Sequence, residues 1–437
     1  MKIYRVTSFK FKNRVKDTFR ALESRNYRLF FTGQTISLIG TWMQRTTMGW
    51  FIYRITGSAF LLGLMGFLSQ IPVLFLNPFA GAIADRYDRR KILVYTQIAF
   101  LVQASILSII VLTNVYQIWM LLALAVMQGM IDSFDGPVRQ AFVIDMVEDK
   151  KYLTNVIALN SAIFNIARLI GPSVAGILII KLSEGYCFSI NAISYIAVII
   201  SLFMMKIKPR EIHVDTNHVF SRIKEGWKYS FSNPLIKHLM SNIAIFTLLG
   251  MSYTTLLPVF AKDILHGNSK TMGLLMSTAG IGALLGALYL ASRKTLSGLV
   301  NKMLIGAGVF STAIIIFSLS RLQALSVTLM FFIGIGMMMQ MAVTNTLLQT
   351  IVDDDKRGRV MSLYSMCMMG ISPFGSILVG AAASHFSSPR TLFVCAILLI
   401  LWTIYSGIKL TGMKSLILSL IQNKMVKEDR NHQKEIN

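Results

Sequence analysis

Residues Gly81–Lys91, Gly-Ala-Ile-Ala-Asp-Arg-Tyr-Asp-Arg-Arg-Lys, decide how this sequence folds. They carry four cationic side chains and two carboxylates, and they separate two long apolar runs, residues 61–80 and 92–112. A stretch this short cannot form a domain, so we expect a tight turn between two membrane-spanning helices. Short loops rich in Lys and Arg stay on the cytoplasmic side of a membrane. The sequence therefore predicts that this turn lies at the cytoplasmic face of a bilayer.

The composition of the whole chain supports a membrane protein. The 437 residues are 54% hydrophobic and 14% charged, whereas a soluble domain has about 25% charged residues. Apolar runs of about 20 residues, the length that spans a bilayer core of roughly 30 Å, recur along the sequence. The predicted fold class is an all-α polytopic membrane protein with about twelve transmembrane helices, arranged as two six-helix halves.

The charge distribution sets the predicted topology and partners. The net charge is +23, and its bases lie in the tails and in alternate loops between the apolar runs. We therefore expect binding to anionic lipid headgroups at the cytoplasmic face rather than to nucleic acid. An even number of spans with basic loops on one side places both termini in the cytoplasm. The cysteines and histidines show no metal-ligand spacing.

Five segments follow from these patterns. Residues 207–234 place Phe220, Ile223, Trp227 and Phe231 at helical spacing, which predicts an amphipathic helix on the inner leaflet or, alternatively, a helix that binds a partner. The predicted segments are a basic cytoplasmic tail (1–26), an N-terminal six-helix bundle (27–206), a cytoplasmic linker with this helix (207–234), a C-terminal six-helix bundle (235–410) and a cytoplasmic tail (411–437).

The two halves resemble each other at an offset of roughly 200–210 residues. Gly171-Pro172 corresponds to Ser372-Pro373, and Val147–Lys151 corresponds to Val352–Lys356. In the second copy of the charged loop, Leu290 stands where the acid would be. Parallel repeats of this kind are how transporters build one site near the bilayer midplane.

Charged side chains within the predicted spans are the first candidate site, because each costs at least a few kcal/mol at the bilayer centre. Asp132 and Arg168 each lie about 20 Å from the outer end of their span. We expect Asp132 or Asp135 to be the counter-ion of Arg168. The ion pair is either a static contact that fixes helix register, or its carboxylate gains and loses a proton during transport. The proton-coupling and ion-pair candidates are Arg45, Asp132, Asp135, Arg139 and Arg168.

Amide side chains in the same spans are the candidates for a substrate cavity. On the fourth span Gln128, Asp132, Asp135 and Arg139 follow at intervals of four, three and four residues, so they share one helix face. The cavity candidates are Gln34, Gln44, Gln128, Asn160, Asn165, Gln340 and Asn345.

Several motifs resemble those of one family. Gly81-x-Ile-Ala-Asp85-Arg86-x-x-Arg89-Arg90-Lys91 resembles the loop between the second and third helices of the major facilitator superfamily of transporters. The bacterial drug- and siderophore-exporter branch, which includes macrolide efflux proteins and the enterobactin exporter, is similar at other motifs. These are Asn26–Phe31 with Gly33-Gln34, Gly40–Gln44, Pro137–Asp145, Ala158–Ser161 and Ala167–Pro172.

The resemblance implies a mechanism and roles for some residues. It implies alternating access, a central cavity lined by the first, fourth, seventh and tenth spans, and proton-driven antiport. Asp85, Arg86, Arg89, Arg90 and Lys91 would steady the cytoplasmic gate, and together with Gly81 they form the candidate gate loop. Independently of the resemblance, Gly81 has no side chain and so lets two helices approach closely. Gly171, Pro172 and Gly176 form a kinked packing motif that partly resembles the fifth-helix motif of antiporters. The fourth-helix arginine that many antiporters place before Gln128-Gly129 is absent here.

The predicted function is efflux of an amphiphilic small molecule, a drug or a siderophore, across the bacterial cytoplasmic membrane. The energy source would be the proton gradient, with no cofactor, no metal and no enzymatic activity, and we expect a monomer. Uptake or flipping of a lipid-like substrate is one alternative. A non-transporting scaffold or sensor is another, although a scaffold gains little from Asp132, Asp135 and Arg168 within the membrane.

Overall fold

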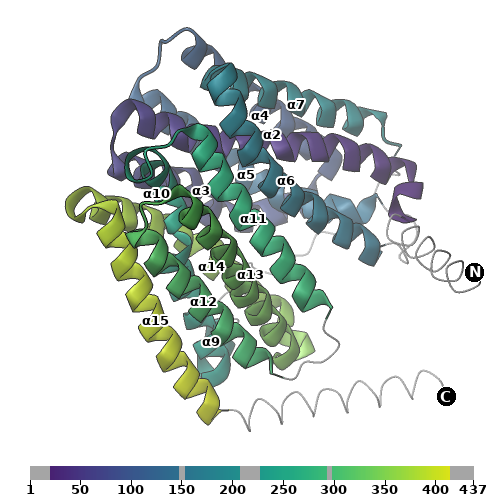
Figure 1. The fold of residues 1–437 in the computed structure, drawn as a ribbon. Helices are drawn as coiled ribbons and strands as arrows, with labels where there is room; N and C mark the ends of the chain where they lie inside the picture. The colour runs from purple at the N-terminus through teal and green to yellow at the C-terminus, as the bar shows by residue number, and fades with distance from the viewer. Residues whose placement is uncertain (1–19, 147–152, 207–226, 293–297, 414–437) are drawn as a thin grey trace, which may run out of the picture. The chain divides into compact units, whose positions relative to one another are not determined.

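The computed structural model describes residues 20–146, 153–206, 227–292 and 298–413, and these form long helices with no strand in the described ranges (Figure 1). Most of both predicted tails, residues 207–226 of the predicted linker, and the basic pair Arg293 and Lys294 lie outside the described residues. Residues 227–232 are helical, and Trp227 and Phe231 stack with ring centroids 5.0 Å apart on an exposed surface.

The helices alternate with short connections along the chain. The first set comprises η1 (Arg20–Glu23), α2 (Arg25–Thr56), α3 (Ala59–Arg86), α4 (Arg89–Leu112), α5 (Ile118–Asp145), α6 (Leu153–Lys181) and α7 (Glu184–Met204). The second comprises α9 (Pro234–Ile245), η3 (Phe246–Met251), α10 (Tyr253–Val259), η4 (Phe260–Ile264), α11 (Ser269–Ala291), α12 (Leu299–Leu319), α13 (Gln323–Ile351), α14 (Asp354–Phe386) and α15 (Ser388–Gly412).

Eleven of the described helical segments are long and apolar enough to cross a membrane. α2 is a further helix of 32 residues, and the polar residues Gln34, Gln44 and Arg45 make it less apolar than the others. The segment from α9 to η4 runs continuously from Pro234 to Ile264 and contains two π-helical stretches, η3 and η4. These observations confirm the predicted all-α polytopic membrane fold.

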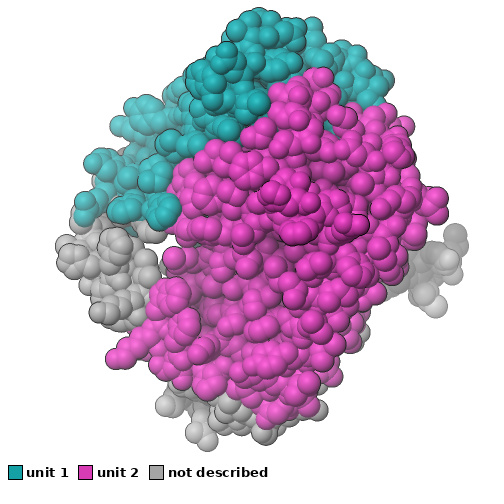
Figure 2. Space-filling model, turned by 90° about the vertical axis from the view of Figure 1, so that its left-hand side faces the viewer, with its two compact units in different colours: residues 1–52, 75–215 teal, residues 53–74, 216–437 magenta. Residues whose placement is uncertain are grey.

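The chain divides into two compact units, shown in Figure 2. Unit 1 comprises residues 1–52 and 75–215, and unit 2 comprises residues 53–74 and 216–437. The predicted N-terminal bundle, residues 27–206, includes residues 53–74, whereas the structure groups these residues with unit 2. The reason is the packing of α3 on α14 described next.

Two glycines let α3 and α14 approach within unit 2. A Cβ atom added to Gly380 would lie 2.7 Å from the Cα of Gly63, and one added to Gly63 would lie 2.5 Å from the carbonyl oxygen of Ser376. One turn further along α3, the ring of Phe67 meets Phe374 edge to face, with centroids 5.7 Å apart. Small residues allow such close approach of membrane helices.

Each unit has its own packed interior. In unit 1, α4 packs against α5 and α7, and Phe100 stacks on Tyr195 with ring centroids 5.2 Å apart. In unit 2, α13 packs against α11 and α12. In the π-helical stretch η4, the ring of Phe260 stacks on the ring of Phe317 of α12, with centroids 4.7 Å apart. The interiors therefore fix the helices that carry the candidate site residues.

Candidate functional site

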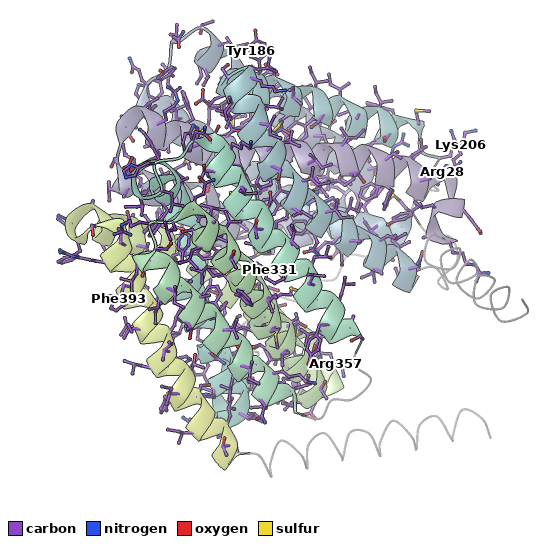
Figure 3. All side chains as sticks on the ribbon, in the orientation of Figure 1. Arg28, Tyr186, Lys206, Phe331, Arg357 and Phe393 are labelled. Carbon is purple, nitrogen blue, oxygen red and sulfur yellow. The ribbon has the colours of Figure 1, made fainter. Side chains whose placement is uncertain are left out.

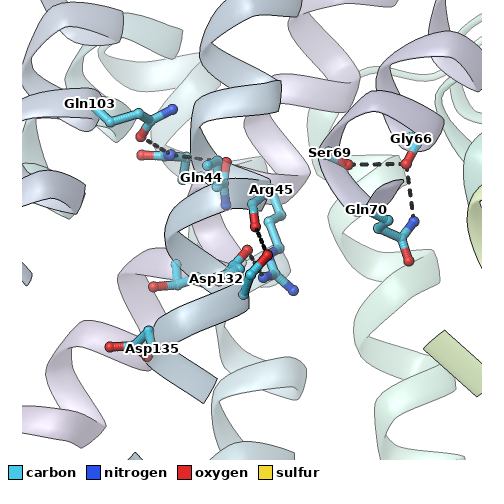
Figure 4. Close-up of polar contacts among 12 residues, drawn as sticks. Gln44, Arg45, Gly66, Ser69, Gln70, Gln103, Asp132 and Asp135 are labelled. Carbon is cyan, nitrogen blue, oxygen red and sulfur yellow. Dashed lines mark hydrogen bonds and ion pairs between the residues drawn. The ribbon is translucent and has the colours of Figure 1, made fainter. Parts of the chain in front are cut away.

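An ion pair joins α2 to α5 in unit 1 (Figure 4). Arg45 Nη2 donates to Asp132 Oδ2 at 2.8 Å. The Arg45 side chain is 44% exposed and the Asp132 side chain is 26% exposed. Neither side chain is fully covered by the described residues.

Asp135, one turn further along α5, is held differently. It is 3% exposed, and its Oδ1 accepts hydrogen bonds from Thr96 Oγ1 at 3.0 Å and Gln97 Nε2 at 2.7 Å. Arg139 Nη2 lies 3.5 Å from its Oδ2. These partners fix Asp135 between α4 and α5. The two carboxylates therefore differ, since Asp132 has one accessible partner and Asp135 sits in a closed network.

Trp42 on α2 brings two guanidinium groups together. The Cζ atoms of Arg45 and of Arg168 on α6 each lie 5.7 Å from the centroid of its ring, a cation–π distance. The sequence analysis expected Arg168 to face Asp132 or Asp135, whereas the structure pairs Asp132 with Arg45 and Asp135 with Arg139. Arg168 is directed to Trp42 because α6 packs on α2 there.

Gly171 makes this packing of α6 on α2 possible. A Cβ atom added to Gly171 would lie 2.5 Å from Trp42 Cβ and 2.9 Å from the carbonyl oxygen of Ile39. Pro172 follows inside α6 without ending the helix, and Gly176 lies further along it. At Gly81, by contrast, an added Cβ would meet no described atom within 4 Å. Close approach therefore occurs at Gly171, and close approach at Gly81 stays a prediction.

A buried amide network connects four helices of unit 1. Gln44 Nε2 donates to Gln103 Oε1 at 3.0 Å and to Gln128 Oε1 at 3.5 Å, and Asn191 Nδ2 donates to Gln44 Oε1 at 2.8 Å. Gln34, also predicted to line a cavity, is 3% exposed. Gln44 and Gln128 thus satisfy each other and their neighbours inside the bundle, and polar groups paired in this way rigidify a core.

The other amide candidates have varied surroundings. Asn165 Nδ2 donates to Ser161 O at 2.8 Å within α6, Asn160 is half-buried, and Asn345 accepts from Gln349 within α13. Gln340 is completely buried, and its amide nitrogen and oxygen have no hydrogen-bond partner among the described residues. Buried polar atoms nearly always have a partner. Among these candidates, Gln340 is therefore the one whose polar side chain is least explained by packing within the bundle.

Arg89 is the centre of the charged turn between α3 and α4. Its Nη1 donates to both carboxylate oxygens of Asp145 at 3.1 and 3.0 Å and to Ala141 O at 3.2 Å. Its Nη2 donates to Asp85 at 3.1 Å and its Nε to Ala84 O at 3.0 Å. The Arg89 side chain is 11% exposed, so it ties the ends of α3 and α5 to the start of α4.

The remaining residues of the turn have lesser roles. Asp88 is the N-cap of α4 and accepts from the backbone N–H groups of Arg90 and Lys91. Arg90 Nη2 donates to Phe203 O at 3.0 Å, whereas the Arg86 and Lys91 side chains are exposed. Asp85 therefore pairs with Arg89, and Asp88 occupies the N-terminus of α4.

The sequence analysis assigned no site role to several contacts. Asp145 lies in one of the family-like motifs, but its contact with Arg89 was not predicted. Trp42 also lies in such a motif, but its contacts with Arg45 and Arg168 were not predicted. In unit 2, the Tyr53 hydroxyl donates to Asp263, and Lys262 Nζ lies 5.6 Å above the Tyr53 ring. These contacts join residues far apart in the chain, so no spacing rule reveals them.

Comparison with known proteins identifies the family. The sequence profile of the transmembrane secretion effector family matches residues 16–434. The chain belongs to this family. It is a multi-pass membrane transporter of the major facilitator superfamily, from the drug- and siderophore-exporter branch, and not an enzyme.

Three curated relatives of this transporter cover most of its length. The staphyloferrin A transporter of Staphylococcus aureus is 28% identical, over 85% of this chain and 92% of the relative. Macrolide efflux protein A of Streptococcus pyogenes is 23% identical, over 85% of this chain and 95% of the relative. The multidrug efflux pump Tap of Mycolicibacterium fortuitum is 22% identical, over 76% and 83%.

Solved structures agree with the fold of this transporter. The inward-facing, unoccupied structure of a bacterial homologue of the human lysosomal transporter Spinster matches with a TM-score of 0.71 at 13% identity, over 92% of this chain and 98% of that chain. A mutant of the nucleoside transporter NupG matches with a TM-score of 0.69 at 13% identity, over 87% and 98%. At this identity the likeness establishes the fold alone.

Proposed function

We propose that this transporter exports an amphiphilic small molecule, a drug or a siderophore, in exchange for protons by alternating access. The observation that carries the proposal is the partly exposed ion pair between α2 and α5. Arg45 Nη2 lies 2.8 Å from Asp132 Oδ2. The curated relatives, whose names include a siderophore transporter and efflux proteins, support the substrate class and the direction.

Asp132 is the proton carrier in this proposal. When Asp132 is ionised, it holds Arg45 by charge and hydrogen bonding. A hydrogen-bond donor group of the substrate can displace Arg45 from the ionised carboxylate of Asp132. When Asp132 binds a proton, its carboxyl group becomes neutral and loses its attraction for that donor group, so the substrate is released. Proton and substrate then compete for one carboxylate, which is the requirement for exchange.

Trp42 gives the released cation a fixed place. Its ring lies against Arg45 and Arg168, and an aromatic face attracts cations by about 0.5–2 kcal/mol. The ring also offers an apolar surface beside two positive charges. An amphiphilic substrate with an aromatic or apolar body beside its donor group matches this apolar surface next to Asp132.

The charge pattern supports the proposed orientation. We infer a bacterial cytoplasmic membrane with both termini in the cytoplasm, because the turn around Arg89 and the connection at Lys356–Arg359 are rich in bases. Anionic headgroups would face these loops. In the proposal the protein acts as a monomer without a cofactor and takes its energy from the proton gradient.

The experiment uses purified protein in liposomes with an imposed pH gradient. Lumenal pH is recorded while macrolides, other amphiphilic drugs and a siderophore are added one at a time. The wild type should show proton flux triggered by at least one compound. Asp132→Asn should remain folded but show no triggered flux, because Asn cannot exchange a proton.

Asp88→Asn is the matched control, because Asn caps a helix as well as Asp does. It should behave like the wild type. Triggered proton flux in Asp132→Asn would contradict the role of Asp132. Silence of the wild type across the panel, with the protein folded, would favour a lipid-like substrate or a scaffold role.

A further inference from the structure

Unit 2 contains a cavity with a volume of about 980 Å³ at the end where α12 and α14 finish and α15 begins. Its lining includes Leu319, Arg321, Phe386, Arg390 and Val394. The two arginines are its charged side chains, and no acidic residue is among the described residues that line it. The cavity therefore combines two positive charges with mainly apolar walls.

Backbone carbonyl groups beside the cavity hold one of these arginines, Arg321, in place. Arg321 Nη1 donates to Ser318 O at 3.4 Å and to Ser320 O at 3.1 Å, so it is anchored at the C-terminal end of α12. A guanidinium has five N–H donors, and these two bonds use one of its nitrogens. Its other donors suit an anion.

Arg390 follows a one-residue junction between α14 and α15. Ser387 at this junction has a φ of +74°, a conformation that non-glycine residues seldom adopt. Thr391 fixes the junction, because its N–H and its Oγ1 both donate to Ser387 O, at 3.1 and 2.9 Å. The cavity is thus bounded by a hydrogen-bonded turn.

The apolar walls are open to the surroundings. Phe386, Leu319 and Val394 are 67%, 63% and 55% exposed. In a membrane-spanning unit such surfaces contact acyl chains. Phe393, another lining residue, and Arg357 lie toward opposite ends of the helices of unit 2 in Figure 3. The cavity therefore opens at the end of unit 2 that is remote from the basic connection at Lys356–Arg359.

The first half of the chain lacks this pair of arginines. Its corresponding junction, between α6 and α7, also has a serine with positive φ, Ser183 at +124°. The next residue there is the acidic Glu184, which is 6% exposed. The first turn of α7 after that junction contains no arginine, and neither does the α4–α5 connection, residues 113–117, which corresponds to the connection that carries Arg321. The repeated fold thus does not require these two arginines. Their presence in the second half points to a ligand.

We propose that this cavity binds an anionic phospholipid of the adjacent leaflet. Arg321 and Arg390 hold the phosphate, since guanidinium groups form strong charge-assisted hydrogen bonds with phosphate oxygens. An acyl chain lies along Leu319, Phe393 and Val394. In the topology proposed above this is the outer leaflet. The lipid is a bound component of unit 2, and its site is separate from Asp132.

The test measures retained lipid. Full-length protein is reconstituted in nanodiscs with equal amounts of phosphatidylglycerol and phosphatidylcholine, extracted, and analysed by native mass spectrometry. The wild type should retain phosphatidylglycerol in preference to phosphatidylcholine. The double variant Arg321→Gln/Arg390→Gln should retain at least tenfold less, and Arg390→Lys should retain more than Arg390→Gln.

Lys270→Gln is the matched control, because Lys270 is an exposed cation at the start of α11, near the same end of unit 2, and is not a lining residue. It should retain lipid like the wild type. Size-exclusion profiles establish that each variant is folded. Equal retention by the double variant and the wild type would overturn the proposal. So would equal retention of both lipids, or full displacement by inorganic phosphate, which would mean a simple anion site.

Discussion

Arg45 on α2 and Asp132 on α5 form a 2.8 Å ion pair whose members stay 44% and 26% exposed. Three residues further along α5, Asp135 is almost fully buried and bound by Thr96 and Gln97 of α4. One helix face thus presents two carboxylates with opposite surroundings. The accessible one suits a group that must change its charge during a transport cycle, and the enclosed one suits a group that holds two helices together.

Asp132→Asn and Asp135→Asn should therefore differ in their effect on stability. A partly exposed ion pair contributes about 0–1 kcal/mol, so Asp132→Asn should change the free energy of unfolding little. Asp135→Asn disturbs buried donors, and an unsatisfied buried group costs about 1–3 kcal/mol. Thermal unfolding of both variants in the same detergent measures the difference, and equal losses would contradict it.

Gln340 offers a test of function against packing. Its buried amide has no partner among the described residues, so Gln340→Met, which keeps a similar volume, should leave stability unchanged or raise it by about 1 kcal/mol. If the amide contacts substrate, transport by the folded variant should fall at the same time. Gln323→Met, at the exposed start of α13, is the control. A loss of stability in Gln340→Met would mean that the amide is satisfied in the folded protein.

Replacing Asp145 should disturb the turn around Arg89 more than replacing Asp85. Asp145 is 22% exposed and accepts two hydrogen bonds from Arg89, whereas Asp85 is 54% exposed and accepts one. Asp145→Asn should therefore lower the transport rate more than Asp85→Asn, with little change in substrate affinity for either. Initial rates over a range of substrate concentrations provide the comparison. The reverse order would show that the exposed pair governs the turn.

Gly380→Ala should destabilise the packing of α3 on α14. The added Cβ would lie 2.7 Å from Gly63 Cα and 2.8 Å from the carbonyl oxygen of Ala59, so backbone must move. Overpacking of this kind costs about 1–3 kcal/mol. Gly308→Ala on α12 is the control, because its Cβ meets no described atom within 4 Å. If both variants unfold at the wild-type temperature, the close contact is not maintained in solution.

The sequence predicts the helices of this fold better than it predicts which helices and residues contact each other. Apolar runs located the spanning helices, and the bases of Gly81–Lys91 located a turn, because both signals are local. Arg45 and Asp132 were recognised as costly in lipid, yet they are 87 residues apart and nothing local shows that they meet. The same limit applies to Arg89 and Asp145. It also applies to residues 53–74, whose unit is decided by contacts with α14.

The candidate cavity residues show a further limit. An amide on an apolar helix looks the same in sequence whether it faces a substrate or another amide. Gln44 and Gln128 are joined in a buried network, whereas Gln340 has no such partner in the described part of the chain. Trp42 was hidden for a related reason, since aromatic residues are common packing groups. Only the position of Arg168 on a neighbouring helix distinguishes it.

The contact of Gly63 with Gly380 also bears on how this transporter can evolve. Every missense change at a glycine codon adds at least a Cβ atom, and at either position that atom would meet the backbone of the other helix. Crowding is often relieved by a compensating mutation to a smaller residue on the partner. Here the partner is already glycine, so no smaller residue exists. Natural selection should therefore keep glycine at both positions.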